Sequence, residues 1–559
     1  MGRPPPVPPF SPLRVPTLMP SPFRHLRLRH LWAAALFCAA GSASAFAQAN
    51  PAVASVRAVA GKTGSPDARR SSASRGRAAK SSKAKARTIA RKRTPAPSPI
   101  TYTAPRGAMQ LAGDLDAILD RASRGGAWGV MVVSLDDGDT LFARNADHSL
   151  LPASTMKLFT SALALERFGP QYRFTTEVLR EGALGSDGTM RGNLVLRGAG
   201  DPSFSRRFTD DASGDTPMAA IARLVAQAGV RRVTGDIVGD ASAFEDRQVP
   251  EGWRSRYLGA HYAARVSALS YNENLLTVHV WASGKAALIS FEPALSGIVV
   301  VNNVKVVAGR GGRIRIRQTD AGIEVRGTVG AAGTGRNSQV VAEHPALMTT
   351  AAFRAALEAQ GIAVDGSARL AKAASGAPRV AALPSATLGE LVTTMNRESN
   401  NHFAEMLFRN AARSVGVVGS AENANILLRR FLWEKAQVPP TDVYAADGSG
   451  LSTADRVTPR AMVQLLGYAA KAPWHEVLEQ SLPVAGRSET LRRRMKYTPA
   501  MGNLHAKTGT TNDVASLGGY VTSGDGNVLA FSFIYNGRNR WRAKEAMDAM
   551  GATLASYQR

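Results

Sequence analysis

A change of hydrophobic pattern along the chain limits the folds it can adopt. Between about residues 175 and 384, short alternating apolar runs are separated by Gly-rich turns, which is the pattern of half-buried strands. On either side apolar residues recur at helical spacing, as in 156–168, 401–413 and 421–436, and two further alternating runs, 515–521 and 528–535, come near the end. We therefore expect an α+β fold of helices and a terminal antiparallel sheet, interrupted by a large β-rich insertion.

The first hundred residues lie outside this pattern and hold most of the charge. They contain 18 Lys and Arg and a single acid, so +17 of the net charge of +26 belongs to them. Arginines precede an apolar run at 31–40, and the small residues Ala45 and Ala47 follow it. A basic segment, a short apolar run and an A-x-A site are typical of a secretory signal, so we predict a cleaved signal peptide over 1–47 and a periplasmic location.

Residues 48–104 are composed mainly of Ala, Ser, Lys, Arg and Pro and cannot bury enough apolar surface to fold. We expect a basic disordered linker, either a plain spacer or an electrostatic tether to anionic cell wall or lipid headgroups, peripheral to wall or membrane. Because the charge is concentrated there, we expect no specific nucleic-acid partner. One cysteine excludes a disulfide scaffold, and no apolar run approaches the roughly 20 residues of a spanning helix.

Ser154 and Lys157 form a Ser-x-x-Lys motif at the start of a predicted helix. Residues three apart share a helix face, so the amine can reach the hydroxyl, and the helix N-terminus favours developing negative charge. The motif alone is weak evidence, because Ser82 and Lys85 have the same spacing in the linker.

Two further motifs follow in the chain. Ser399-Asn400-Asn401 lies between two predicted helices, where a loop can present a hydroxyl and an amide, and Lys507-Thr508-Gly509-Thr510 leads into the terminal strands. A glycine there allows close approach to the strand backbone. Each motif has a decoy elsewhere, but the three in this order are far more specific than any one of them.

These motifs resemble those of the penicillin-binding serine D-Ala-D-Ala peptidases, and within them the penicillin-binding protein 4 type (family S13, class C low-molecular-mass). The long interval between Ser154 and Ser399 is the mark of that family. The resemblance implies a serine transpeptidase/β-lactamase-like catalytic domain over 105–175 and 385–559, and β-rich inserted domain(s) over 176–384. We also expect 447–452, Asp-Gly-Ser-Gly-Leu-Ser, to shape the cleft.

The resemblance also implies a role for each motif residue and no cofactor or metal. Ser154 would be the acylated nucleophile, Lys157 its general base, and Ser399 the relay of a proton to the leaving amine. Substrate binding would fall to the remaining motif residues, Asn401, Lys507, Thr508, Gly509 and Thr510. The backbone N–H groups of Ser154 and Thr510 would form the oxyanion hole.

We therefore predict an exported D-Ala-D-Ala carboxypeptidase, endopeptidase or both, which acts on peptidoglycan through an acyl-enzyme and is acylated by β-lactams. Two alternatives stay open. One is a serine esterase or β-lactamase of the same superfamily, and the other is a non-catalytic protein that binds cell wall or polyanions. We interpret His402 and His505, which lie beside motif residues, as structural.

Overall fold

The computed structural model describes residues 98–559 except 123–124, 211 and 320–321. The predicted signal peptide and nearly all of the predicted linker lie outside these residues. Within the described part of the chain, no helix has both the length and the apolar character needed to cross a membrane.

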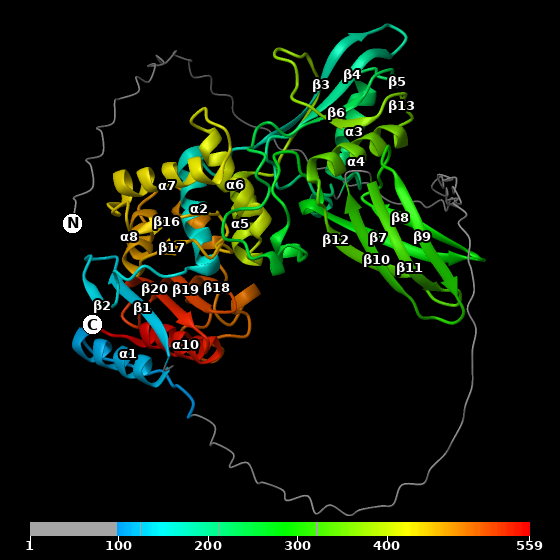
Figure 1. Cartoon of the computed structure of the whole chain (residues 1–559). Coiled ribbons are helices and arrows are strands. Elements are labelled where there is room, and N and C mark those ends of the chain that lie inside the picture. Colours follow the sequence, from blue (N-terminus) through cyan, green and yellow to red (C-terminus); the bar gives the residue numbers. More distant parts are fainter. Residues whose placement is uncertain (1–97, 123–124, 211, 320–321) are drawn as a thin grey trace, which may run out of the picture. The chain divides into compact units, whose positions relative to one another are not determined.

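A five-stranded antiparallel sheet, in the order β18-β19-β20-β1-β2, joins the two ends of the described chain (Figure 1). Its strands are β1 (Gly126–Ser134), β2 (Thr140–Arg144), β18 (His505–Thr510), β19 (Val514–Thr522) and β20 (Val528–Gly537). β1 and β2 form a hairpin, and β1 also pairs with β20, where Trp128 lies opposite Tyr535. The chain ends must therefore meet before this sheet is complete.

Helices cover both faces of this sheet. On one face α1 (Ala108–Ala122) and α10 (Arg540–Ser556) pack together, with Leu115, Phe533 and Met547 in their shared core. The other face carries α8 (Pro459–Ala469), which packs on β20 and β1, and a second core of mainly helical residues. That core belongs to α2 (Met156–Phe168), α5 (Leu388–Glu398), α6 (Asn401–Arg413), α7 (Ala421–Ala436), α8 and α9 (His475–Gln480).

Local signals in the sequence set the ends of these helices. α2, α6 and α7 occupy the residues expected from apolar spacing. Gly169 ends α2 with a φ of 73°, a conformation that glycine adopts without strain, and the Ser420 side chain caps α7. The one-and-a-half-turn helix α9 was missed, because six residues are too few to show a period.

A seven-stranded sheet, unlike the first, contains parallel pairs, and α3 (Pro217–Gln227) and α4 (Pro345–Ala359) pack on it. Its strands are β3 (Thr175–Leu184), β4 (Thr189–Arg197), β5 (Arg232–Val233), β6 (Ile237–Asp240), β13 (Ala363–Val364), β14 (Ala368–Leu370) and β15 (Arg379–Pro384). β4 runs parallel to β6 and antiparallel to β3. Its first strand begins at Thr175 and its last ends at Pro384, beside the predicted limits of the insertion.

Two three-stranded sheets complete this region and share one small core. They are β7 (Leu275–Ser283), β8 (Ala286–Glu292) and β12 (Arg336–Val341), and β9 (Val300–Val307), β10 (Arg313–Thr319) and β11 (Gly322–Gly330). We refer to residues 176–384 as the insertion; its division into domains stays a prediction. A short pair, β16 (Val443–Tyr444) and β17 (Arg456–Val457), frames the 447–452 loop.

Candidate active site

The residues before α2 form a tight turn that places Ser154 at the helix N-terminus. A single 3₁₀ turn, Ala153–Thr155, leads directly into α2, and Ala153 has a φ of 48°. The Pro152 carbonyl accepts hydrogen bonds from the hydroxyls of Thr155 (2.8 Å) and Ser516 (2.6 Å). This turn is thereby tied to β19 of the five-stranded sheet.

Lys157 is completely buried one helical turn later and contacts three acceptors. Its Nζ lies 3.1 Å from Ser154 Oγ, 2.7 Å from Asn401 Oδ1 and 2.7 Å from the carbonyl oxygen of Ser449. The amine therefore faces the hydroxyl, as the three-residue spacing predicted, and two other chain segments fix its position.

The loop between α5 and α6 presents Ser399 and Asn401. Ser399 ends α5 in the left-handed region (φ 58°), and the Asn400 side chain caps α6 by accepting from the Phe403 N–H. Asn401, the first residue of α6, also donates its amide to the carbonyl of Tyr262 in the insertion, at 2.8 Å. The helix break thus turns both motif side chains toward Lys157 and Lys507.

The edge strand β18 supplies Lys507, whose Nζ donates to Ser399 Oγ at 3.0 Å. Lys507 and Gly509 point to the interior, while Thr508 and Thr510 alternate to the more exposed side. The Thr508 hydroxyl donates to the Thr490 hydroxyl at 3.0 Å. Side chains from all three motifs therefore meet, with the two threonines at the edge.

Gly509 packs closely against the turn that carries Ser154. A Cβ added there would overlap Ser516 Oγ and lie 2.8 Å from the Pro152 oxygen and 3.0 Å from the Ser154 nitrogen. The missing side chain lets β18 pack directly on the turn that carries Ser154.

Burial shifts the pKa of both lysines. Removal from water lowers the pKa of Lys157 to about 8, although the buried carboxyl groups of Asp447, Glu405 and Asp455 oppose the shift. Burial also holds the pKa of Lys507 well below the ordinary lysine value, and the nearby Lys157 charge adds to the effect. The dominant cause at Lys157 is therefore burial. At pH 8 and above much of Lys157 is neutral, the state of a base.

Three buried carboxyl groups lie behind Lys157, and of these only Asp447 belongs to a segment that we had connected with the cleft. Burial raises the pKa of Glu405 to about 7 and that of Asp455 well above its usual range. Glu405 pairs with the buried Arg409 at 2.8 Å, and Asp447 accepts from Trp253 of the insertion. The position of Glu405 on a mainly apolar helix could have indicated a buried carboxyl group near the site. Nothing in the sequence connected Trp253 to the motifs.

Neither motif-adjacent histidine contacts the lysines. Burial lowers the pKa of His402 to about 4, and its Nε2 lies 3.4 Å from Asn274 Nδ2. His505 Nδ1 faces Glu479 at 3.5 Å. These contacts agree with the structural interpretation of both residues.

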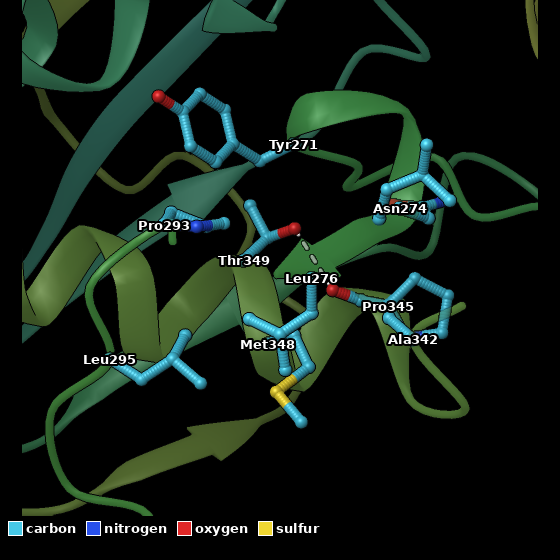
Figure 2. Close-up of a pocket in the computed structure, with 10 residues that line it drawn as sticks. Tyr271, Asn274, Leu276, Pro293, Leu295, Ala342, Pro345, Met348 and Thr349 are labelled. Atoms are coloured by element: carbon cyan, nitrogen blue, oxygen red, sulfur yellow. Dashed lines mark hydrogen bonds between the residues drawn. The ribbon is translucent and has the colours of Figure 1, made fainter. Parts of the chain in front are cut away.

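The hollow in Figure 2 lies in the insertion, away from the motif residues. Its lining includes Tyr271, Leu276 and Met348, and the Thr349 hydroxyl donates to the Pro345 carbonyl beside it. Its volume of about 10 Å³ holds at most a single water molecule, so this hollow does not offer a substrate site.

Comparison with known families supports this arrangement. The model of the family described as "D-Ala-D-Ala carboxypeptidase 3 (S13) family" matches residues 111–557. The D-alanyl-D-alanine carboxypeptidase of Actinomadura sp. (strain R39) is 34% identical over 470 residues, which cover 80% of this chain and 85% of the relative. The D-alanyl-D-alanine carboxypeptidase DacB of Haemophilus influenzae is 26% identical over 420 residues, which cover 73% of this chain and 85% of the relative.

Among solved structures, penicillin binding protein 4 (dacB) from Haemophilus influenzae has a similar fold. The TM-score is 0.65 at 22% sequence identity, and the match covers 78% of this chain and 98% of that one. A second structure of that protein, complexed with a β-lactam, gives a TM-score of 0.61. The predicted α+β fold, an antiparallel sheet with helices interrupted by a large β-rich insertion, is thereby confirmed.

Proposed function

The chain belongs to the D-Ala-D-Ala carboxypeptidase S13 family and is a serine-type D-Ala-D-Ala carboxypeptidase, and from this premise we propose how its site works. The predicted family and the predicted serine-type D-Ala-D-Ala carboxypeptidase activity are thus confirmed. We propose that Ser154 is acylated by the D-Ala-D-Ala carbonyl of peptidoglycan stem peptides and that crosslinks are a second substrate. The observation that supports this proposal most directly is that the buried Lys157 amine lies between Ser154 Oγ and Asn401 Oδ1.

Acylation begins with a proton transfer that this geometry supports. Neutral Lys157 accepts the proton of Ser154 Oγ as that oxygen attacks the carbonyl, and Asn401 holds the amine in line. The oxyanion forms beside the N–H groups of Ser154 and Thr510, where the N-terminus of α2 favours negative charge. The bond between the carbonyl carbon and the D-Ala nitrogen then breaks, and this nitrogen takes, through Ser399, the proton that Lys157 accepted. Water attacks the acyl-enzyme in turn, Lys157 takes its proton and passes it to the departing Ser154 Oγ, and the shortened peptide is released as an acid.

Lys507 binds the terminal carboxylate in this proposal, together with the hydroxyls of Thr508 and Thr510. The free site disfavours the charged form of Lys507, because the side chain is buried and Lys157 lies near it. A bound carboxylate favours the ammonium form again, so carboxylate binding and the charge of Lys507 support each other. A β-lactam carries a carboxylate and a reactive amide carbonyl, so the same residues would direct it to Ser154.

Labelling with a fluorescent penicillin tests the assignment of Ser154. We expect Ser154→Ala to lose both covalent labelling and D-Ala release by several orders of magnitude, as removal of a nucleophile does. The chain offers a matched control in Ser82→Ala, which removes the serine of the identical Ser-x-x-Lys spacing in the linker. Labelling that persists in Ser154→Ala would refute the proposal.

Product analysis separates the possible substrates. Mass spectrometry of digested peptidoglycan would show loss of terminal D-Ala for a carboxypeptidase and cleaved crosslinks for an endopeptidase. Rapid turnover of nitrocefin without action on peptides would instead indicate a β-lactamase.

We also propose export to the periplasm and electrostatic attachment through the basic linker. The support is the charge of the first hundred residues and the surface around Ser98. The carbonyl of Ser98 accepts from Arg542 at 2.6 Å, beside Trp541, which is 68% exposed with Arg540 and Lys544 near its ring. The linker therefore joins the folded enzyme at a surface that is itself basic and aromatic, which suits an anionic lipid surface.

A further inference from the structure

A short relay of hydrogen bonds connects the insertion to the buried lysine. Trp253 donates its indole N–H to Asp447 Oδ2 at 2.7 Å, and both residues are buried. The 447–452 loop that begins at Asp447 contacts Lys157 directly. We propose, on the basis of the function proposed above, that Asp447 is a positioning residue for Lys157 and that Trp253 holds Asp447 in place for this role.

Five donors converge on the carboxyl group of Asp447, at distances of 2.6 to 3.1 Å. They are the Trp253 indole, the backbone N–H groups of Ser449, Gly450 and Ser452, and the Ser449 hydroxyl. An ionised carboxylate only accepts hydrogen bonds and so matches a set made only of donors. The 447–452 loop is thus folded around this single carboxylate.

The folded loop delivers one group to the site, the Ser449 carbonyl that lies 2.7 Å from Lys157 Nζ. The neighbouring Gly448 is fixed as well, because its N–H donates to Glu405 (3.0 Å) and its carbonyl accepts from Thr160 (2.6 Å). With Ser154 Oγ and Asn401 Oδ1, the Ser449 carbonyl forms a three-point support for the amine. Displacement of this carbonyl would leave Lys157 with two supports and a less precise approach to the hydroxyl.

The insertion reaches the same loop at two more points. The Ser452 hydroxyl donates to the Glu251 carbonyl at 2.6 Å, and the Thr453 hydroxyl donates to the Gly252 carbonyl at 3.0 Å. Gly252 itself has a φ of 75° and leaves no room for a side chain against Ser452. Residues 251–253 therefore clamp the loop, which gives the insertion a physical connection to the chemistry of Ser154.

Charges of several elements act on Lys157. Asp447 and Asp455, from the loop region, and Glu405, from α6, favour its protonated form. Arg409 neutralises part of the Glu405 charge through their ion pair, and Lys507 lies on the β18 side. Asp447 also raises the pKa of Asp455, so its removal changes the charges around Lys157 as a group, and the maximum rate is the readout of loop position.

The first test is Trp253→Phe, which keeps the ring and removes the N–H donor. Trp281→Phe is the matched control, since Trp281 lies in β7 of the insertion, where it pairs with Leu288 of β8. We expect the second-order rate of penicillin acylation to fall about tenfold or more in Trp253→Phe, as for small misplacements of reacting groups. KM for a peptide substrate should change little, and Trp281→Phe should match the wild type.

The second test is Asp447→Asn, with the acylation rate measured as a function of pH. We expect a lower maximum and an acidic limb moved to lower pH, because the charge that favours protonated Lys157 is gone. A lower rate at every pH with the limb in place would mean that Asp447 acts through the position of the loop alone, which still supports the inference.

Equal acylation rates of Trp253→Phe and Trp281→Phe would overturn the inference, and so would a wild-type maximum rate in a folded Asp447→Asn. If Asp447→Asn does not fold, the acylation rate of Trp253→Phe relative to Trp281→Phe decides whether the inference holds. A wild-type enzyme that is not labelled at Ser154 would instead overturn the proposed function, so the two failures are distinguishable.

Discussion

Replacement of Gly509 by alanine tests whether close packing of β18 on the Ser154 turn is needed for the chemistry. The new Cβ would overlap Ser516 Oγ, which holds the Pro152 carbonyl. It would also lie 2.8 Å from the Pro152 oxygen, so an ordinary contact of about 3.4 Å needs the strand or the turn to move by roughly 0.6 Å. Both neighbours are backbone or buried, and neither can rotate away cheaply.

The displacement should affect rate and stability together. Misplacement of reacting groups by about 1 Å can cost about a hundredfold in rate, so we expect acylation by penicillin to slow by about tenfold to a hundredfold. Overpacking of a close-packed contact typically costs about 1–3 kcal/mol, so the free energy of unfolding should fall by that amount. Stopped-flow acylation and urea denaturation measure the two effects.

Gly113→Ala is the matched control, because a Cβ there meets no heavy atom within 4 Å. Gly113 lies within α1, where alanine is favoured by about 1 kcal/mol, so this variant should be more stable and equally active. If Gly509→Ala acylates at the wild-type rate with unchanged stability, our account of why β18 needs a glycine is incorrect.

Three further predictions follow from charge and burial. Because Lys157 is a base only when neutral, the rate of acylation by penicillin should rise as pH increases through about 8, and Lys157→Ala should fold but acylate very slowly. A rise of that rate centred near pH 10 would contradict the lowered pKa of Lys157. In the folded chain His402 stays neutral until the pH falls to about 4, whereas in the unfolded chain it takes up a proton near pH 6.5. The free energy of unfolding should therefore decrease as the pH falls below 6.5, by about 2 kcal/mol at pH 5. This slope should flatten in His402→Gln and remain in the exposed control His148→Gln, as measured by urea midpoints. Removal of residues 48–97 should leave D-Ala release intact but weaken binding to anionic vesicles at low salt, since exposed charges are screened over about 8 Å at physiological ionic strength. A control in which Gln replaces the Lys and Arg of that segment should bind as weakly as the truncated chain. Equal binding by the wild type and both variants would make the segment a plain spacer.

The sequence determined the helices of the catalytic region and the identity of the three motifs. Apolar spacing is a local property, so the limits of α2, α6 and α7 could be predicted, and Ser154 and Lys157 share a helix face whatever surrounds them. The break between α5 and α6 was equally local, because the caps at Ser399 and Asn400 lie beside each other in the chain. The comparisons then confirmed the family that these motifs indicated.

Only the tertiary structure decided what surrounds Lys157. Trp253 and Asp447 are 194 residues apart in the chain, and their hydrogen bond exists only after the insertion has folded against the 447–452 loop. The lowered pKa of Lys157 likewise depends on burial by several segments. Even Gly509, which the sequence marked as a place of close approach, revealed its neighbour only in the packed structure. Desolvation and long-range contacts are produced by packing, and a pattern along the chain contains only the part of the site that is local.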